Sequence, residues 1–199
     1  MLSVETLGWL DPTAWMHGMS NQTQGFTLVE CMVCLAVACL LAAVAIPAYS
    51  RVQTKAQLTF LKSELTNAIA QSTRTSIATA SYVVLCPGGN SCSEGSDWSQ
   101  GWLAFVDTDG DRSRASSEPL LLHHGDLPKG FRIVTPAGRS SLLFNKKGAT
   151  PGSNTIFTIC HVSKRAQAQS LVIANSGRLR QQPATPDAAE ACRTSTASR

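Results

Sequence analysis

Residues 1–25 contain no lysine or arginine and no long apolar run. An ordinary secretory signal begins with a basic segment that leads into a short apolar one, so this N-terminus is not a signal of that kind. Aromatic residues make up only 6% of the 199 residues, and charged residues only 15%. The sequence also has no nucleophile elbow, phosphate-binding loop or metalloprotease motif. We therefore expect a protein that is not an enzyme and uses no cofactor.

The apolar residues are concentrated in one run near the N-terminus. Between Glu30 and Arg51, all twenty residues from Cys31 to Ser50 are uncharged. At about 1.5 Å of rise per helical residue they reach about 30 Å, the thickness of the hydrocarbon core of a bilayer. This run excludes a purely soluble cytosolic enzyme and predicts a membrane-spanning helix over residues 26–50. A carboxylate at the edge of the hydrocarbon is costly without a partner, so Glu30 is a candidate functional residue.

The residues that lead into this run form the motif Gly25-Phe26-Thr27-Leu28-Val29-Glu30. Together with the apolar run, it resembles the class III signal of type IV pilins and type II secretion pseudopilins. The resemblance implies that a prepilin peptidase removes residues 1–25 as a leader and methylates Phe26. It also implies that Glu30 faces the N-terminal amine of a neighbouring subunit in the assembled filament. Without the acidic Glu5 and Asp11 of the leader, the net charge rises from +4 to +6.

The helical pattern continues beyond the apolar run. Pro47 lies inside the pattern, and residues 52–79 contain no proline or glycine. Apolar and small residues recur there at intervals of three and four, which is typical of one buried face of a helix. These residues are Leu58, Leu61, Leu65, Ala68, Ile69 and Ser72. We expect an amphipathic helix over residues 51–80 that covers a sheet.

The second half of the chain changes to short runs of strand-forming residues separated by Gly, Pro and Asp. Such a pattern predicts a β-rich head domain over residues 81–182, with one small antiparallel sheet or two packed sheets. Residues 183–199 are rich in Ala, Ser and Pro and are predicted to be a mobile tail with Cys192 as its anchor. A helix packed on such a sheet is an α+β architecture. The seven predicted strands are 82–85, 102–106, 120–122, 131–134, 141–144, 156–160 and 171–174.

The first of these runs carry a second resemblance. The segment 84–86, followed by Cys92, the element Trp98-Ser99-Gln100-Gly101-Trp102 and the segment 105–107, is similar to the FimT/GspH family of minor pilins and minor pseudopilins. The resemblance implies a type IV pilin-like fold, in which a long N-terminal helix has a membrane half and an amphipathic half and packs on a small antiparallel head.

The same resemblance implies a function in filament initiation or at the filament tip. The partners would be other major and minor pilins or pseudopilins, and the chain would first be held in the bacterial inner membrane by a single span, with its head in the periplasm. A type IV pilus and a type II secretion pseudopilus both remain open, because subunits of the two share the signal and the α+β head.

Seven cysteines divide into three in the apolar run and four in the head. Thiols in an apolar helix behave as small hydrophobic groups, so Cys31 and Cys34 are not expected to bind a metal. The other four are Cys86, Cys92, Cys160 and Cys192, which can pair in three ways. We favour Cys86 with Cys92, which closes a tight Pro-Gly-Gly loop, and Cys160 with Cys192. Zinc is the alternative, with His161 beside Cys160 as one further ligand.

An acidic segment lies between two of the predicted strands. Asp107, Asp109, Asp111 and Glu118 stand at positions one, three, five and twelve of a calcium-binding loop. The turn glycine of such a loop should follow Asp111, and Arg112 stands there instead. The favoured interpretation is a hairpin turn with local side-chain hydrogen bonds and no metal. Calcium is the alternative.

Charge is segregated along the chain. Residues 86–126 hold seven acids and two bases, whereas residues 129–199 hold eleven bases and two acids, a net charge of +9. If they lie on one face, these bases could form a phosphate-binding strip for DNA, although no aromatic residue follows Phe157 for base stacking. The segment Gly177–Arg180 matches the Gly-Arg-x-Arg segment that the pilus-type branch of the family links to DNA uptake. The favoured interpretation is a solvated basic face that aids docking to other pilins or to acidic surfaces, and DNA binding is the other. The DNA-binding candidates are Lys146, Lys147, Lys164, Arg165, Arg178 and Arg180.

Overall fold

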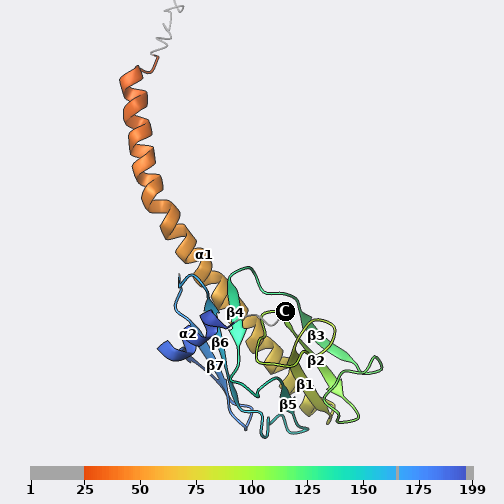
Figure 1. Ribbon diagram of the computed structural model, residues 1–199. Helices are drawn as coiled ribbons and strands as arrows, with labels where there is room; N and C mark the ends of the chain where they lie inside the picture. The colour runs from red at the N-terminus through yellow and green to blue at the C-terminus, as the bar shows by residue number, and fades with distance from the viewer. Residues whose placement is uncertain (1–24, 165, 196–199) are drawn as a thin grey trace, which may run out of the picture. The chain divides into compact units, whose positions relative to one another are not determined.

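The structure is a computed structural model that describes residues 25–164 and 166–195. The predicted leader therefore lies outside the described residues except for Gly25, and so does Arg165. The chain divides into two compact units, of which the first ends at Val44 and the second begins at Ala45. Two helices and eight strands are present in the described residues (Figure 1), namely α1 Leu28–Ala78, β1 Tyr82–Pro87, β2 Trp102–Asp107, β3 Leu120–His124, β4 Phe131–Val134, β5 Leu142–Phe144, β6 Thr155–His161, β7 Gln169–Ile173, β8 Leu179–Pro183 and α2 Pro186–Thr194.

Helix α1 begins at a side-chain cap in the first unit. The Oγ1 of Thr27 accepts a hydrogen bond from the backbone N–H of Glu30 at 3.2 Å, which satisfies one of the free N–H groups at the start of the helix. Every residue from 25 to 49 is exposed. Among the described residues, α1 is the one helix with the length and hydropathy to cross a membrane.

The part of α1 in the second unit carries the predicted buried face. Leu58, Leu61, Leu65, Ala68, Ile69 and Ser72 are all at most 4% exposed. The five apolar residues of this set belong to one hydrophobic core with residues of six strands, β1, β2, β4, β5, β6 and β7. A helix packed on antiparallel sheets confirms the predicted α+β, type IV pilin-like fold.

The strands form two antiparallel sheets of four. Their orders are β3-β2-β1-β5 and β4-β6-β7-β8. The loop between β1 and β2 links them, because the N–H of Trp98 donates to the carbonyl of Ile133 at 2.8 Å in β4 of the second sheet. Each of the seven predicted strands has a counterpart, but β8 was not predicted. It is an edge strand in which only Leu179 packs against the core, so its sequence has little apolar signal.

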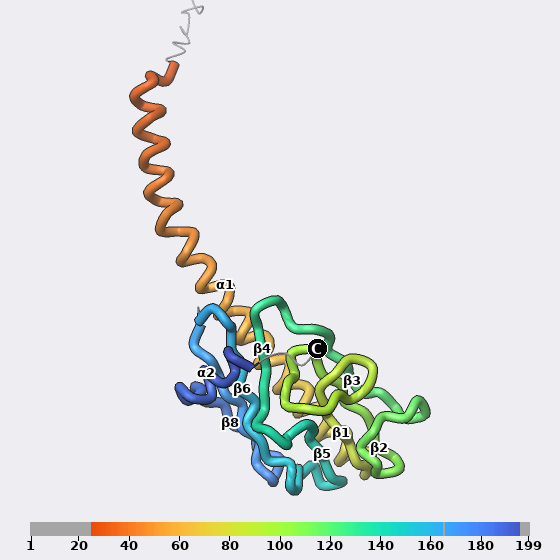
Figure 2. Tube along the Cα trace, viewed as in Figure 1, coloured from red at the N-terminus to blue at the C-terminus, as the bar shows by residue number. Residues whose placement is uncertain are grey.

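Residues 183–195 differ from the mobile tail that the sequence predicts over residues 183–199, of which 196–199 lie outside the described residues. Residues 186–194 form α2, which lies beside β6 and β4 (Figure 2). The Oγ1 of Thr185 accepts a hydrogen bond from the N–H of Ala188, and Pro186 occupies the first turn, where its missing N–H costs nothing. Ala189 and Cys192 are buried. The predicted anchor is present, because Cys192 is bonded to Cys160, but the predicted mobility was wrong for residues 186–194. A small-residue composition was interpreted as disorder although it carried a helix start signal.

Candidate functional site

The N-terminal motif is presented on an exposed helix start. Gly25 and Phe26 precede the helix without regular structure, and Glu30 lies in the first turn. A carboxylate there interacts favourably with the positive end of the helix dipole. The spacing of Thr27 and Glu30 is that of a capping box, a signal that the sequence contains but that the sequence reasoning missed. Glu30 therefore has a local role at the helix start in addition to any role between subunits.

The head contains two disulfides, Cys86–Cys92 and Cys160–Cys192, which are the favoured pairs. The first closes the loop after β1, and the second joins β6 to α2. Because Cys160 is bonded to Cys192, its thiolate is not available as a zinc ligand beside His161. Cys31, Cys34 and Cys39 are free and exposed along α1.

The Trp-x-x-Gly-Trp element is a packing element of the head. Trp98 and Trp102 are each 1% exposed, and Trp98 packs edge-to-face on Phe157 with ring centroids 4.8 Å apart. Gly101 adopts a φ of +93°, and a Cβ there would overlap the carbonyl oxygens of His124 and Gly125. A side chain at this position is excluded by both conformation and space.

Four of the candidate basic residues are carried by two chain segments that meet. Thr150, in the connection between β5 and β6, donates through its N–H to the carbonyl of Asn175 and through its hydroxyl to that of Ala174, both at 2.9 Å. Asn175 lies in the turn between β7 and β8. The first segment carries Lys146 and Lys147, and the second leads directly into Arg178 and Arg180; all four are exposed.

The structure separates Lys164 from these four residues. Lys164 follows the far end of β6, a strand of seven residues that spans about 20 Å. Its Nζ lies 3.2 Å from the Oε2 of Glu190 in α2. The hydrogen bond from Lys164 and the positive charge of Lys164 hold the pKa of Glu190 below its usual value. Lys164 is therefore engaged by an acid, and Arg165 lies outside the described residues.

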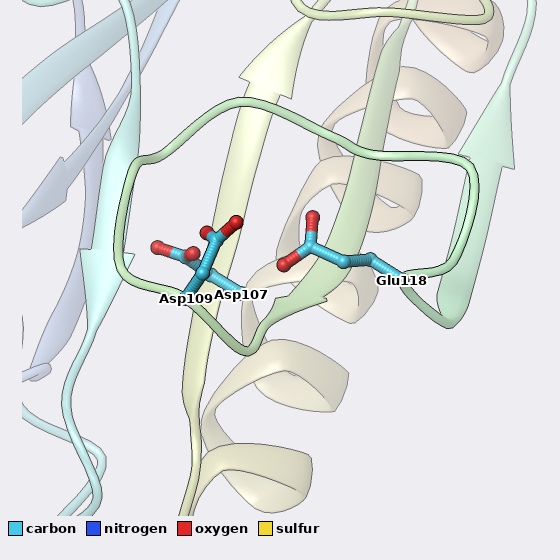
Figure 3. Close-up of side chains that lie close together, drawn as sticks. All are labelled: Asp107, Asp109 and Glu118. Carbon is cyan, nitrogen blue, oxygen red and sulfur yellow. The ribbon is translucent and has the colours of Figure 1, made fainter.

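The acidic segment brings together three of its four candidate residues. Asp107 ends β2, Asp109 lies in the following loop, and Glu118 precedes β3; Figure 3 shows the Glu118 carboxylate pointing across the loop toward the two aspartates. One oxygen of each carboxylate lies within 4.8 Å of the others. Asp111 is not part of this group. Arg112 has a φ of +64°, the left-handed conformation that a calcium loop would give to glycine.

An apolar N-terminal helix that runs into a disulfide-bonded antiparallel head defines the class of pilin-like subunits, which are structural proteins and not enzymes. The chain belongs to the GspH family: the model of the type II transport protein GspH matches residues 63–177. The prokaryotic N-terminal methylation motif matches residues 20–46, which implies a substrate of the prepilin peptidase and pilin-like partners.

Solved structures include a protein with a similar fold. The type IV minor pilin FimU of Pseudomonas aeruginosa PAO1 is 18% identical, with 63% of this chain and 88% of FimU covered and a TM-score of 0.51. The minor pseudopilin EpsH of the Vibrio cholerae type 2 secretion system is 8% identical, with 64% and 97% covered and a TM-score of 0.48. No curated protein is significantly similar to the sequence.

Proposed function

We propose that this chain is a minor subunit that helps to initiate a filament or to form its tip, in a type IV pilus or a type II secretion pseudopilus. It is held first in the inner membrane by the apolar part of α1, with the head in the periplasm. The prepilin peptidase cleaves after Gly25 and methylates Phe26. The subunit then leaves the lipid for a bundle of neighbouring N-terminal helices.

The exposed apolar surface of α1 carries this proposal. Ten large apolar side chains between residues 28 and 46 are each at least 50% exposed. Burial of one such side chain contributes about 1.5–3 kcal/mol, so together they strongly favour a covered state. Lipid covers them before assembly and neighbouring helices cover them afterwards. The ten residues are Leu28, Val29, Met32, Val33, Leu35, Val37, Leu40, Leu41, Val44 and Ile46.

Glu30→Gln tests the assembly role. If Glu30 pairs with the N-terminal amine of a neighbouring Phe26, the variant leaves the positive charge of that amine unpaired in an apolar bundle. An unpaired buried charge costs about 3–5 kcal/mol. We expect cleavage after Gly25 to persist and co-purification with other filament subunits to fall at least tenfold. Intact mass of the membrane-extracted chain under non-reducing conditions reports cleavage, methylation and disulfides, and quantitative pull-down reports assembly.

Glu64→Gln is the matched control, because Glu64 lies on the same helix but in the second unit. It should leave both readouts unchanged. Wild-type material that still begins upstream of Phe26 and never co-purifies with other subunits would contradict the proposed function. Equal co-purification of the wild type and Glu30→Gln would instead reject the ion pair alone.

A second candidate function is DNA binding at the filament tip. It is supported by the meeting of the two segments that carry Lys146, Lys147, Arg178 and Arg180. Leu179 packs toward the core, and successive side chains of a strand alternate between its faces. Arg180 therefore points to the opposite, outer face of edge strand β8. Arg178 directly precedes the strand and is exposed, so a phosphate backbone could reach both residues.

Replacement of both Arg178 and Arg180 by Gln tests this function. Each lost phosphate contact reduces the slope of log K against log salt by about 0.9 for duplex DNA, so we expect the slope to fall by about two units. DNA affinity should fall for all sequences alike, and filament assembly should remain intact. Binding of the full chain to duplex DNA is measured by gel shift at several salt concentrations.

Lys164→Gln is the control for charge alone, since Lys164 lies at the far end of β6 and pairs with Glu190. It should change DNA affinity less than twofold. Unchanged affinity in the double arginine variant would reject the DNA function in favour of a solvated or subunit-docking basic face.

A further inference from the structure

The acidic loop between β2 and β3 buries charge that the described protein groups do not neutralise. Asp107 is 2% exposed and Glu118 is 3% exposed. The ion pairs among the described residues involve only Glu190 as the acid, so neither carboxylate has a Lys or Arg within ion-pair distance there. Two buried carboxylates that lie next to each other repel and are costly without a counter-charge.

Most carboxylate oxygens of the loop have hydrogen-bond donors. Glu118 accepts from the N–H and hydroxyl of Thr108 and from the N–H of Ala115. The Oδ1 of Asp107 accepts from the N–H of Gly110 at 2.8 Å, and the Oδ1 of Asp109 accepts from the N–H of Asp111. These local hydrogen bonds account for the closure of the loop on Glu118, as expected for a hairpin turn that holds no metal.

The burial of one carboxylate oxygen is not explained by these hydrogen bonds. The Oδ2 of Asp107 is fully buried and has no hydrogen-bond partner. An unpaired buried oxygen costs about 1–3 kcal/mol, or more when it is charged, so a native loop that keeps one calls for a partner from outside the chain, either a water or a cation.

The atoms that these three residues can offer to a metal ion are all carboxylate oxygens, which suit hard cations. Calcium accepts such ligands in flexible geometry at 2.3–2.6 Å and completes its shell with carbonyl oxygens and water, whereas magnesium demands near-ideal octahedral geometry and keeps its waters. We propose that Asp107, Asp109 and Glu118 bind a calcium ion that ties the start of the loop after β2 to its end before β3. Calcium modules outside the cytosol bind with a Kd of about 10⁻⁴–10⁻³ M, the range expected here.

Calorimetric titration of the chelator-treated full chain in detergent with CaCl₂ tests the site. We expect one saturable ion per chain and, at a hundredfold excess over the Kd, a melting temperature about 5–10 °C higher. MgCl₂ should bind at least tenfold more weakly. The absence of both saturable heat and a melting shift up to about 10 mM calcium, or equal binding of the two metals, would overturn the proposal.

Asp109→Asn is the sharpest variant. Asp109 is exposed, and Asn keeps an oxygen that can accept from the N–H of Asp111, so the loop should retain its hydrogen bonds. We expect calcium affinity to fall at least tenfold without a change in the calcium-free melting temperature. Asp111→Asn is the matched control in the same loop and should stay within twofold of wild type. Equal calcium affinity in Asp109→Asn and wild type, or an equal loss in Asp111→Asn, would reject the assigned ligands.

Discussion

Leu65→Ala is expected to lower the free energy of unfolding of the head by about 2–5 kcal/mol. Leu65 is fully buried on the face of α1 that joins both sheets into one core. Its truncation removes apolar contacts and leaves a cavity that two sheets and a helix cannot easily fill. Thermal and urea unfolding of the full chain in detergent, followed by the fluorescence of the buried Trp98 and Trp102, measure the loss.

Phe60→Ala is the matched control on the same helix. Phe60 is 59% exposed, so its truncation should change the free energy of unfolding by no more than about 0.5 kcal/mol. Because Ala is a better helix former than Phe, a loss as large as that of Leu65→Ala could not come from helix propensity and would show that the cost of truncation does not depend on burial in the shared core.

The architecture could be predicted because its main signals are periodic and local. The buried face of α1 repeats at helical spacing, and the interior strands of the two sheets contain runs of Val, Leu and Ile such as Val83–Leu85 and Leu171–Ile173. In contrast, β8 and α2 depend on contacts that are distant in sequence. A helix of nine residues is marginal by itself, and α2 is stabilised by its packing on β6 and by Cys192.

The candidate sites were predictable only as sets of residues. The spacing of Asp107, Asp109 and Glu118 pointed to one loop, but only the folded loop shows that Asp111 lies outside their group. Likewise, the basic residues were visible as a charge excess. Which of them share a surface depends on the hydrogen bonds of Thr150 to the turn before β8, a contact across 24 residues.

Replacement of Cys160 and Cys192 together by Ala is expected to lower the free energy of unfolding by about 3.5 kcal/mol. The two cysteines are 32 residues apart, and a bridge over such a loop removes that much conformational freedom from the unfolded chain. Because both side chains are buried and α2 is short, we also expect α2 to detach and the amides of residues 188–195 to lose protection. Urea unfolding and hydrogen exchange of the full chain measure the two effects.

The Cys86→Ala, Cys92→Ala variant separates the loss of stability caused by removal of any disulfide from the detachment of α2. Its cysteines are only six residues apart, so the expected loss is smaller, about 2 kcal/mol, and α2 should keep its protection. The hydrogen bond from Arg132 to the carbonyl of Arg193 at 3.2 Å is a second tie between α2 and β4. If α2 stays protected when Cys160 and Cys192 are replaced, this tie and the burial of Ala189 hold the helix, and the disulfide acts only on the unfolded state.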